Sequence, residues 1–314
     1  MMSRMANPLS FFPSMMNLSI LFWNCQGVSS PGFESTFKTT SKIYKPDIVI
    51  ILEPKVSVVK ADYFIKGSGF EFSHRVEAEG FAGGIWILWN RGFAMEFVIN
   101  HKKYIHFKVT NFSGNWSCVT AVYASPNPSL RRKFWNELKS IAKSIKGPWM
   151  LGGDFNSILH ALEKKGGSPK SSGICRSFNN WFHDNRLIDL HFKGPCFTWF
   201  RGTLFKRLDR VICNDHWNSL FTEASILHLP KIHSDHRPIL VNFKPHLNKR
   251  NSVKPFRFLA AWLMDHYFIS LVAKEWRDSK GYFQATHDFV DKVSKWNRII
   301  LGIFLKEKGE FLQE

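Results

Sequence analysis

The amino-acid sequence predicts an α/β fold. Short apolar runs of strand length, bounded by turn-forming residues, recur through most of the first 244 residues, and segments with helical spacing lie between them. The chain has 314 residues, of which 44% are hydrophobic and 15% aromatic, so it can bury a large core. These observations favour one large domain, with or without an appendage, and argue against a mostly disordered chain.

The expected strands are apolar runs that end in turn signals. In chain order they are residues 18–23, 48–52, 84–89, 119–123, 149–151, 196–200, 209–212 and 239–243. The clearest expected helix spans residues 129–145, where apolar side chains recur every three or four positions and would bury one face. Shorter helical patches are expected at residues 35–44 and 175–185.

A change in composition sets the expected end of the compact domain at residue 244. The chain is thereby divided into a flexible leader, a compact domain, a basic linker and a helical tail, at residues 1–16, 17–244, 245–255 and 256–314. The tail carries apolar residues at the spacing of two amphipathic helices. Pro8 and Pro13 interrupt the leader, which has no apolar run long enough for a secretory signal or a membrane span, so no membrane partner is expected.

The formal net charge of +18 predicts a polyanionic partner. Lys and Arg number 43 against 25 Asp and Glu, and a basic surface attracts nucleic acid or anionic lipid through a long-range field. Charge does not distinguish these two partners. The five cysteines lie far apart, with no C-x-x-C pair and no paired histidine spacing of a zinc site, which indicates a reducing intracellular compartment.

Polar side chains follow the first two predicted strands. Asn24 comes at the end of the first strand and Glu53 directly after the second, and strand ends are where α/β proteins build their sites. Side-chain oxygens of this kind are the ligands that Mg²⁺ prefers. Taken singly, each residue has another explanation, since Asn24 can cap a turn and Glu53 can be a solvated charge.

A later predicted strand runs into two glycines, a carboxylate and an amide. In this string, Gly152-Gly153-Asp154-Phe155-Asn156, the two polar side chains lie two residues apart on the same side of the chain. Asp154 can therefore hold and polarise a water for attack on phosphorus, while Asn156 donates to a phosphate oxygen or orients Asp154. The alternative is an Asp-x-Asn turn in which both side chains bond to local backbone.

Two further candidate positions are Tyr123 and the Asp235-His236 pair. Tyr123 ends a predicted strand with a phenol that could contact a phosphate oxygen, or that could simply be a half-buried aromatic. His236 directly precedes a predicted strand and could act as a general acid or base, with Asp209 as the carboxylate that fixes its tautomer. A satisfied surface pair of Asp235 and His236 is the alternative.

The order of these residues resembles that of the endonuclease/exonuclease/phosphatase superfamily. Between residues 18 and 244 the chain carries, in the superfamily's order, Asn24, Glu53, Tyr123, Asp154, Asn156, Asp209, Asp235 and His236. The strings Phe-Trp-Asn-Cys-Gln-Gly at 22–27, Leu-Glu-Pro-Lys at 52–55 and Gly-Phe-Ala-Gly-Gly-Ile-Trp at 80–86 resemble plant LINE-type (non-LTR) retrotransposon endonucleases in particular. The resemblance implies a four-layered α/β sandwich of two packed, mainly antiparallel sheets with outer helices.

The resemblance also implies a reaction and the residues that perform it. The reaction is hydrolysis of nucleic-acid phosphodiesters, specifically nicking of DNA in the nucleus to leave a 3′-OH, with Mg²⁺ or Mn²⁺ as cofactor. The implied metal residues are Glu53, Asn24 and Asp235. The implied catalytic residues are Asp154 and Asn156 at the attacking water, Tyr123 at the phosphate or leaving group, and His236 as an acid/base oriented by Asp209.

Two other functions stay open at this point. One is a decayed retroelement copy that binds DNA without cutting it, and the other is the same fold acting on an inositol phosphate or a lipid head group. The basic side chains that could hold DNA, or could equally be solvated surface charges, are Lys55, Arg131, Arg132, Arg201 and Arg237. Asp189 and residues 194–199 match superfamily positions with a structural or DNA-contact role. We expect the tail to be a truncated connection towards a reverse transcriptase.

Overall fold

The computed structural model describes most of the predicted compact domain and part of the tail, namely residues 16–77, 83–167, 173–243, 266–275, 289, 292 and 293. Backbone contacts divide the chain into two units, Met1–His246 and Leu247–Glu314. Residues 1–15 of the predicted leader and the whole predicted linker lie outside the described residues, whereas Met16 is buried. No helix in the described part of the chain has the length and apolar character needed to cross a membrane.

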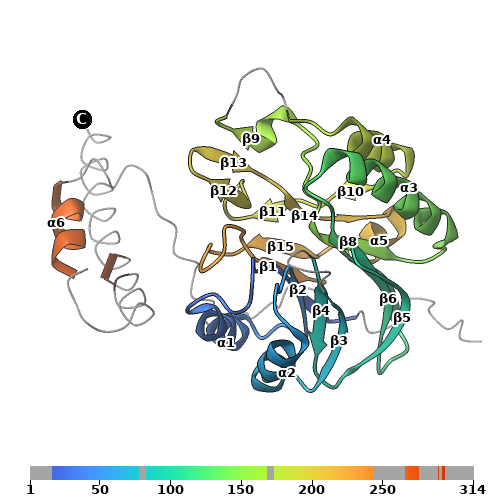
Figure 1. Cartoon of the computed structure of the whole chain (residues 1–314), viewed down its shortest axis with the longest axis horizontal. Coiled ribbons are helices and arrows are strands. Elements are labelled where there is room, and N and C mark those ends of the chain that lie inside the picture. Colours follow the sequence, from blue (N-terminus) through green and yellow to red (C-terminus); the bar gives the residue numbers. More distant parts are fainter. Residues whose placement is uncertain are drawn as a thin grey trace, which may run out of the picture. The chain divides into compact units, whose positions relative to one another are not determined.

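Two large sheets form the centre of the first unit (Figure 1). Among the described residues, the first sheet has seven strands in the order β11 (Phe192–Lys193), β15 (Ser225–His228), β16 (Ile239–Asn242), β1 (Ser19–Asn24), β2 (Ile48–Leu52), β4 (Ile85–Trp89) and β3 (Phe72–Val76). Only β1 with β2 and β11 with β15 are parallel pairs; the other neighbours are antiparallel.

The second sheet packs against the first. In the described chain it has six strands in the order β10 (Ile188–Asp189), β14 (Asp209–Cys213), β8 (Trp149–Asp154), β7 (Trp116–Tyr123), β6 (Tyr104–Asn111) and β5 (Phe93–His101). Here only β7 and β8 are parallel. Both sheets are therefore mainly antiparallel, as predicted.

Helices cover the outer faces of both sheets. The helices of the first unit are α1 (Phe33–Tyr44), α2 (Val58–Gly67), α3 (Pro128–Ser144), α4 (Arg176–Asp184) and the short α5 (Asp215–Leu220). In Figure 1, α1 and α2 lie on the side of the first sheet, and α3 and α4 lie on the side of the second. The order of layers is helix, sheet, sheet and helix, so the predicted four-layered sandwich is confirmed.

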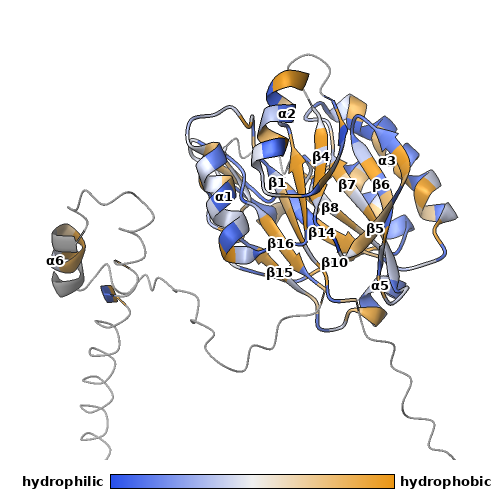
Figure 2. Ribbon diagram, turned by 90° about the horizontal axis from the view of Figure 1, so that it is seen from below, coloured by the Kyte–Doolittle hydropathy of each residue, from blue (hydrophilic) through white to orange (hydrophobic). Residues whose placement is uncertain are grey.

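Three apolar clusters fill the spaces between these four layers. Inward-facing residues such as Phe22 of β1 and Met150 of β8 join the two sheets, while Phe64 packs α2 on the first sheet and Trp135 packs α3 on the second. Figure 2 shows the result, with apolar strands inside and polar helix faces outside. Burial of apolar surface on both sides of each sheet explains why the central strands read as continuous apolar runs.

A small third sheet lies beside the two large ones and was not predicted. It joins β12 (Trp199–Arg201), β13 (Leu204–Lys206) and β9 (Lys164–Lys165), which follows the short helical turn η1 (Ala161–Glu163). The strand predicted at 196–200 begins only at Trp199. The ladder with β13 pairs only Trp199, Phe200 and Arg201. Thr198 lies just before it, where its hydroxyl accepts the backbone N–H groups of Leu208 and Asp209, at 3.0 and 2.9 Å.

Two adjacent glycines allow β8 to lie close to Phe22 of the first sheet and to the neighbouring strand β7. A Cβ atom on Gly152 would lie 2.5 Å from the ring of Phe22, and one on Gly153 would lie 2.2 Å from the carbonyl oxygen of Val122. Gly153 also has a φ of 131°, which L side chains rarely adopt. The prediction that the strand breaks at these glycines was wrong, because β8 continues through them to Asp154.

The second unit contains the described helix α6 (His266–Glu275). Leu271 and Val272 of this helix pack against Phe289 and Val293. The tail was predicted to contain two amphipathic helices, and α6 lies in the first of these two segments. The other tail positions on which that prediction depended lie outside the described residues.

Candidate active site

The sheet topology brings the ends of four strands together. Asn24 ends β1, Tyr123 ends β7 and Asp154 ends β8, while Glu53 directly follows β2. Asp209 begins β14, and because β14 is antiparallel to β8, Asp209 pairs in register with Asp154. Residues that are up to 185 positions apart in the sequence thus lie at one edge of the two packed sheets.

Asp154 is almost completely buried and is held by three donors. Its Oδ1 accepts the backbone N–H of Asn156 at 2.8 Å, and its Oδ2 accepts the side-chain amides of Asn156 at 2.9 Å and Asn24 at 3.0 Å. Burial raises the pKa of Asp154 to about 7, against the lowering effect of His236. Asn156 also donates to the carbonyl of Ala124, 32 positions away, at 2.9 Å. Of the two predicted alternatives, the structure has the contact between Asn156 and Asp154, whereas only Asp154 bonds to local backbone.

His236 lies among the carboxylates of the site. Its Nδ1 is 2.8 Å from Oδ2 of Asp209, which fixes the ring with Nδ1–H as the donor. Its Nε2 is 4.0 Å from Oδ2 of Asp154 and 3.9 Å from Oδ1 of Asp235. Burial alone would lower the pKa of His236, but the charges of Asp209 and Asp154 outweigh burial and raise it to about 9. At neutral pH the ring is therefore a proton donor towards an anion.

Glu53 has a separate set of partners. The hydroxyl of Tyr123 donates to Oε1 of Glu53, and Nζ of Lys55 lies 2.8 Å from Oε2. Burial and the neighbouring carboxylate of Glu53 raise the pKa of Tyr123 well above its usual value, so its hydroxyl stays protonated. Tyr123, predicted to contact the phosphate or leaving group, contacts Glu53 in this structure.

Asp235 is only partly buried, unlike most of the predicted residues. Its side chain is 36% exposed, and its Oδ2 accepts the indole N–H of Trp199 at 2.8 Å. Its Oδ1 is buried and has no hydrogen-bond partner among the described residues. An enclosed carboxylate oxygen without a hydrogen-bond partner is unfavourable. We therefore expect a cation or a water molecule to bind at this atom.

The loops that carry these residues contain unusual backbone. Five non-glycine residues of the site loops have positive φ angles between 46° and 54°, namely Gln26, Glu53, Lys55, Asn156 and His233. Such conformations cost of order 1 kcal/mol each and cluster at functional sites. The hydroxyl of Ser234 ties two of the loops together, since it donates to the carbonyl of Asn24 and accepts the N–H of His236.

The predicted residues border one cavity of about 1130 Å³. Glu53, Asp154, Asn156, Asp235 and His236 line it directly, while Asn24, Tyr123 and Asp209 reach it through hydrogen bonds to those residues. All eight predicted site residues are thus brought together.

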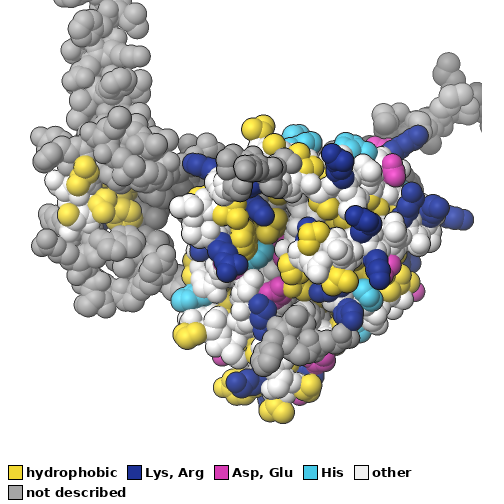
Figure 3. Space-filling view, turned by 45° about the horizontal axis from the view of Figure 1, so that its top comes forward, with side chains coloured by type: hydrophobic (Ala, Val, Ile, Leu, Met, Phe, Trp, Pro, Cys, Tyr) yellow, Lys and Arg dark blue, Asp and Glu magenta, His cyan; other side chains and the backbone are white. Residues whose placement is uncertain are grey.

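Basic side chains surround the same cavity. Its rim includes Lys55, Arg131, Arg132 and Arg201, which were candidates for DNA contact, and also Arg176 and Lys206. Figure 3 shows a face of the molecule on which Lys and Arg side chains are frequent and acidic side chains few. Arg237 instead donates to the carbonyls of Phe197 and Leu229, so it has a structural role.

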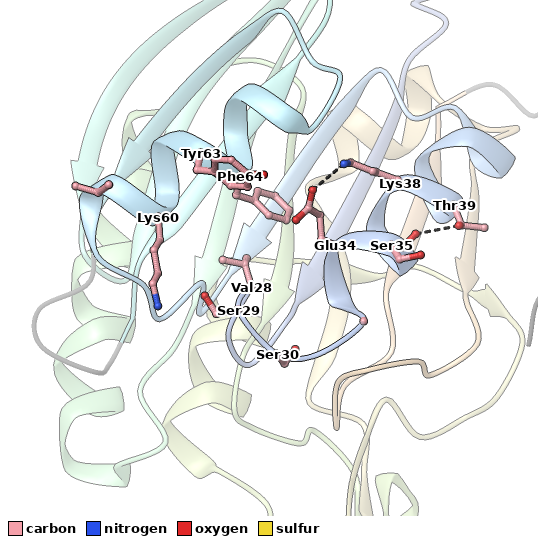
Figure 4. Close-up of a pocket in the computed structure, with 12 residues that line it drawn as sticks. Val28, Ser29, Ser30, Glu34, Ser35, Lys38, Thr39, Lys60, Tyr63 and Phe64 are labelled. Atoms are coloured by element: carbon pink, nitrogen blue, oxygen red, sulfur yellow. Dashed lines mark hydrogen bonds and ion pairs between the residues drawn. The ribbon is translucent and has the colours of Figure 1, made fainter. Parts of the chain in front are cut away.

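A second cavity, of about 920 Å³, lies between α1 and α2 (Figure 4). Its wall includes Glu34, which pairs with Lys38 at 2.7 Å, together with Ser29, Lys60 and Tyr63. None of the eight predicted site residues lines it. The acid, base and carboxylate groups needed for hydrolysis border the other cavity, which is therefore the candidate active site.

The donors around the active-site cavity suit a divalent metal ion. Carboxylate oxygens are the ligands that Mg²⁺ and Mn²⁺ prefer, and the partnerless Oδ1 of Asp235 offers one without breaking any hydrogen bond. One ligand atom each from Asp154, Asp209 and His236 also lie within 4.8 Å of one another. Oδ2 of Asp154 and Oδ2 of Asp209 already accept hydrogen bonds from Asn24, Asn156 and His236, so the fit is better on the side of Asp235.

This fold and site agree with a family match over most of the domain. Residues 21–236 match the Endonuclease/Exonuclease/phosphatase family, and the chain belongs to this family. No curated protein sequence matches the chain significantly. The match begins within β1 and ends at His236, so it includes every strand end that contributes to the site.

Several solved structures share the fold at low sequence identity. The endonuclease domain of TRAS1, a telomere-specific non-LTR retrotransposon, is 15% identical, with a TM-score of 0.56 over 73% of this chain and 99% of that domain. The AP endonuclease LMAP from Leishmania major is 14% identical, with a TM-score of 0.56 over 77% and 92%. A 3′-5′ exonuclease from Neisseria meningitidis is 17% identical, with a TM-score of 0.56 over 72% and 100%. These likenesses show the fold.

Sequence reasoning missed two contributors to the site. Ser234, which joins two site loops, stands next to Asp235 in the sequence and could have been included with that pair. Trp199 was named only within residues 194–199, with a structural or DNA-contact role, and its bond to Asp235, 36 positions away, was not predicted. Cys175 lines the cavity from the N-cap position of α4, and no pairing pattern among the cysteines distinguishes it.

Proposed function

We propose that this protein is a Mg²⁺- or Mn²⁺-dependent endonuclease that nicks DNA and leaves a 3′-OH, as the endonuclease of a LINE-type retroelement. The observation that carries the proposal is the cavity in which Asp154 and His236 lie 4.0 Å apart beside the carboxylates of Glu53 and Asp235. Nuclear residence follows as part of the proposal, because the DNA target of such an element is chromosomal.

Glu53 and Asp235 would hold the metal, with Asn24 beside them. A bound divalent cation supplies charge that stabilises the crowded oxygens of a phosphodiester under attack. Tyr123 donates to one oxygen of Glu53 and so fixes the direction of its carboxylate. Lys55, which lies against the other oxygen, keeps positive charge at the place where a phosphate would bind.

Asp154 would take the proton of the attacking water. Its three hydrogen bonds fix both oxygens, and its pKa near 7 allows it to gain a proton at neutral pH. His236, with a raised pKa, would remain an imidazolium and donate from Nε2 to a phosphate oxygen, where negative charge develops. Asp209 accepts the hydrogen bond from Nδ1–H of His236, so the opposite ring nitrogen, Nε2, is directed away from β14.

The basic rim of the cavity supports a nucleic-acid substrate. Arg132, Arg176 and Arg201 are exposed side chains at the cavity, and exposed guanidinium groups bind phosphates on either side of a scissile bond. A deep pocket for a single small head group would not require cations along an open rim. TRAS1 supports the LINE assignment, since it is by its description a retrotransposon endonuclease of the same fold.

The test is conversion of supercoiled plasmid to open circles with Mg²⁺ or Mn²⁺ and a chelator control. We expect Glu53→Gln, Asp154→Asn and His236→Asn each to lower the nicking rate by at least about a hundredfold, since each removes a group that acts in the transition state. Their melting temperatures should stay near that of the wild type. Nicking by all three variants at the wild-type rate would refute the assignment.

The same material separates the two other functions. A remnant that binds without cutting would retard DNA in a gel but never produce open circles with either metal. A phosphatase of this fold would release phosphate from inositol phosphates or lipid head groups and leave plasmid intact. Ligation of the nicked product by DNA ligase, after 5′-phosphorylation if required, shows whether the 3′ end carries a hydroxyl.

A further inference from the structure

The two oxygens of the Asp235 carboxylate are treated differently by the protein. Oδ2 accepts the indole N–H of Trp199 at 2.8 Å. Oδ1 is enclosed and has no hydrogen-bond partner within the described ranges of the chain. The single hydrogen bond to Oδ2 orients the carboxylate. Oδ1 is then left to bind a cation or a hydrogen-bond donor that enters the cavity.

The indole is fixed relative to this carboxylate by the backbone around it. Trp199 forms an isolated antiparallel bridge with His236. On one side the N–H of Phe200 donates to the carbonyl of Asp235 at 3.2 Å, and on the other the N–H of Arg237 donates to the carbonyl of Thr198 at 2.8 Å. Three consecutive residues of the β12 edge are therefore joined to three consecutive residues of the site loop.

The hydrogen-bond donor that Trp199 offers to Asp235 carries no charge. An indole N–H therefore directs the carboxylate of Asp235 without cancelling its negative charge. Glu53 differs in charge only, because the ammonium group of Lys55 lies 2.8 Å from its Oε2, although that oxygen also has no hydrogen-bond partner among the described residues. The nearest charged group to Oδ1 of Asp235 is the ring of His236, whose Nε2 is 3.9 Å away and beyond hydrogen-bond distance, so Oδ1 is left to bind a cation from the cavity.

From this geometry we propose that Trp199 is a positioning residue, whose indole N–H holds Asp235 so that its second oxygen faces the divalent cation of the active site. The inference rests on the proposed metal-dependent function. It also gives the small third sheet a role, because Trp199 begins β12 and thereby couples the β12–β13 hairpin to the metal side of the cavity.

The competing role for Trp199 is direct contact with substrate. Its ring lines the cavity and is half-buried, and Nζ of Lys206 lies 5.8 Å from the centre of the ring. An aromatic ring at such a place could stack on a DNA base. The two roles differ in what they predict, since stacking affects DNA binding and positioning affects metal binding in the absence of DNA.

The first experiment measures Mn²⁺ binding to the full chain without DNA, from the paramagnetic resonance signal of free Mn²⁺. Trp199→Phe keeps the ring and removes the N–H, and we expect its Mn²⁺ dissociation constant to rise about tenfold. The matched control is Trp116→Phe, at the start of β7, seven positions from Tyr123 at the site end of that strand. The control should bind Mn²⁺ like the wild type, and DNA affinity in EDTA should change less than twofold in both variants.

A double-mutant cycle shows whether Trp199 acts through Asp235. In an Asp235→Ala background, Trp199→Phe should cause no further loss of Mn²⁺ affinity, because the carboxylate that it positions is gone. Independent, multiplying losses would overturn the proposal. So would a Trp199→Phe variant with wild-type Mn²⁺ affinity and weakened DNA binding, which is the result that a stacking role predicts.

A measurement on the unmutated protein keeps the proposal testable even if Trp199→Phe folds poorly. In a ¹⁵N spectrum with assigned indole resonances, the Trp199 N–H signal should shift when Mg²⁺ is added, whereas that of Trp116 should not. An unchanged Trp199 signal at saturating Mg²⁺ would overturn the proposal.

The outcomes also separate this inference from the proposed function. If the wild type binds Mn²⁺ with the expected dependence on Trp199 but never nicks DNA, the endonuclease assignment fails and the inference stands. If the wild type nicks DNA and Trp199→Phe binds Mn²⁺ normally, the inference fails and the assignment stands. If the wild type binds no divalent metal, both fail.

Discussion

Burial has opposite consequences for the two central groups of the site. It raises the pKa of Asp154 to about 7 because a buried carboxylate resists ionisation. It acts against protonation of His236, yet the neighbouring carboxylates prevail and raise its pKa to about 9. Asp154 can therefore accept a proton near neutral pH while His236 retains one. Hydrolysis of a phosphodiester needs both a general base and a proton donor.

Cys175 gives access to the cavity by chemical labelling. Burial would raise the pKa of its thiol, but hydrogen bonds from the Ser177 side chain and the Phe178 N–H outweigh burial and lower it. In contrast, burial raises the pKa values of Cys25 and Cys213 to about 12. Because the thiolate is the reactive form, we expect iodoacetamide at pH 7 to modify Cys175 well before Cys25 or Cys213, as read by peptide mass spectrometry.

Because Cys175 lines the active-site cavity, the modification should also block nicking. The control is Cys175→Ser, which should nick DNA at a rate within about threefold of the wild type and should resist inactivation. Bound DNA should slow the labelling. Inactivation of Cys175→Ser by iodoacetamide at the wild-type rate would place the critical thiol elsewhere.

Two buried histidines outside the site make stability depend on pH. Burial lowers the pKa values of His106 and His228 to about 4, from an ordinary value of about 6.5. A depressed folded-state pKa means that the unfolded chain binds the proton first as pH falls. Stability is therefore full above about pH 6.5 and is lost between about pH 6.5 and 4, by about 2 kcal/mol per histidine between pH 7 and 5.

The measurement is urea unfolding of the wild type and His106→Asn at pH 7 and pH 5. His106 accepts or donates at Nδ1 to the Thr120 hydroxyl, at 2.8 Å, and the side-chain amide of Asn can replace that contact. The variant should lose less stability between the two pH values than the wild type does. Equal losses in both proteins would mean that His106 does not contribute to the acid sensitivity.

The elements on the far side of β14 are joined by a buried ion-pair network. Arg210 is fully buried in β14 and contacts Glu163 of η1 at 2.7 Å and Asp189 of β10 at 3.0 Å. Arg207 contacts the same two carboxylates. The network fixes the chain on either side of Asp209, and its two positive and two negative charges balance. Asp189, expected to be structural or to contact DNA, thus has a structural role here.

Removing one member of this network leaves buried charge without a partner. We expect Arg210→Met to lower the free energy of unfolding by about 3–5 kcal/mol, measured by urea denaturation. The exposed pair Lys38–Glu34 on α1 is the matched control, and Lys38→Met should cost under about 1 kcal/mol. Similar losses in the two variants would contradict a structural role for the buried network.

Most of the strands that the sequence predicted have both faces buried, although the largely buried β6 was missed because His106, Lys108 and Thr110 interrupt its apolar run. Residues 48–52 form β2 with the predicted bounds, because all five side chains lie in the core and read as one apolar run. β5 was missed although Phe93, Met95 and Phe97 alternate with exposed residues, which is the signal of an edge strand covered on one face. Short strands such as β9 and β11 have no signal of their own, since their partners are distant in sequence.

For the site, the candidate residues and the contact of His236 with Asp209 were predicted, whereas two other contacts were not. The ordered set from Asn24 to His236 follows from residue types at strand ends and from the family resemblance. The Tyr123–Glu53 bond and the Trp199–Asp235 bond depend on which strands become neighbours, and that is decided by the packing of the two sheets. Sequence separation of 70 and 36 residues hides both contacts.

For the molecule as a whole, a net charge of +18 could attract DNA either through local contacts at the cavity or through the overall field. Arg132 and Arg176 are exposed at the cavity. Lys42 and Lys66 are exposed in the last turns of α1 and α2, which lead into the starts of β2 and β3, at the strand ends opposite Glu53. The pair Arg132 and Arg176 and the pair Lys42 and Lys66 each carry two positive charges. Removing one pair or the other therefore separates the effect of local phosphate contacts on DNA binding from the effect of net charge.

We expect DNA binding in EDTA to weaken steeply with salt, with a slope of log Kd against log salt that reflects the number of phosphates contacted. Arg132→Ala with Arg176→Ala should lower that slope by about 1–2, because each phosphate contact contributes about 0.9 on duplex DNA. Lys42→Ala with Lys66→Ala removes the same charge and should leave the slope within about 0.5 of the wild type. Equal reductions in both double variants would show that the chain attracts DNA through its net charge, and that the basic rim of the cavity has no special part in holding the substrate.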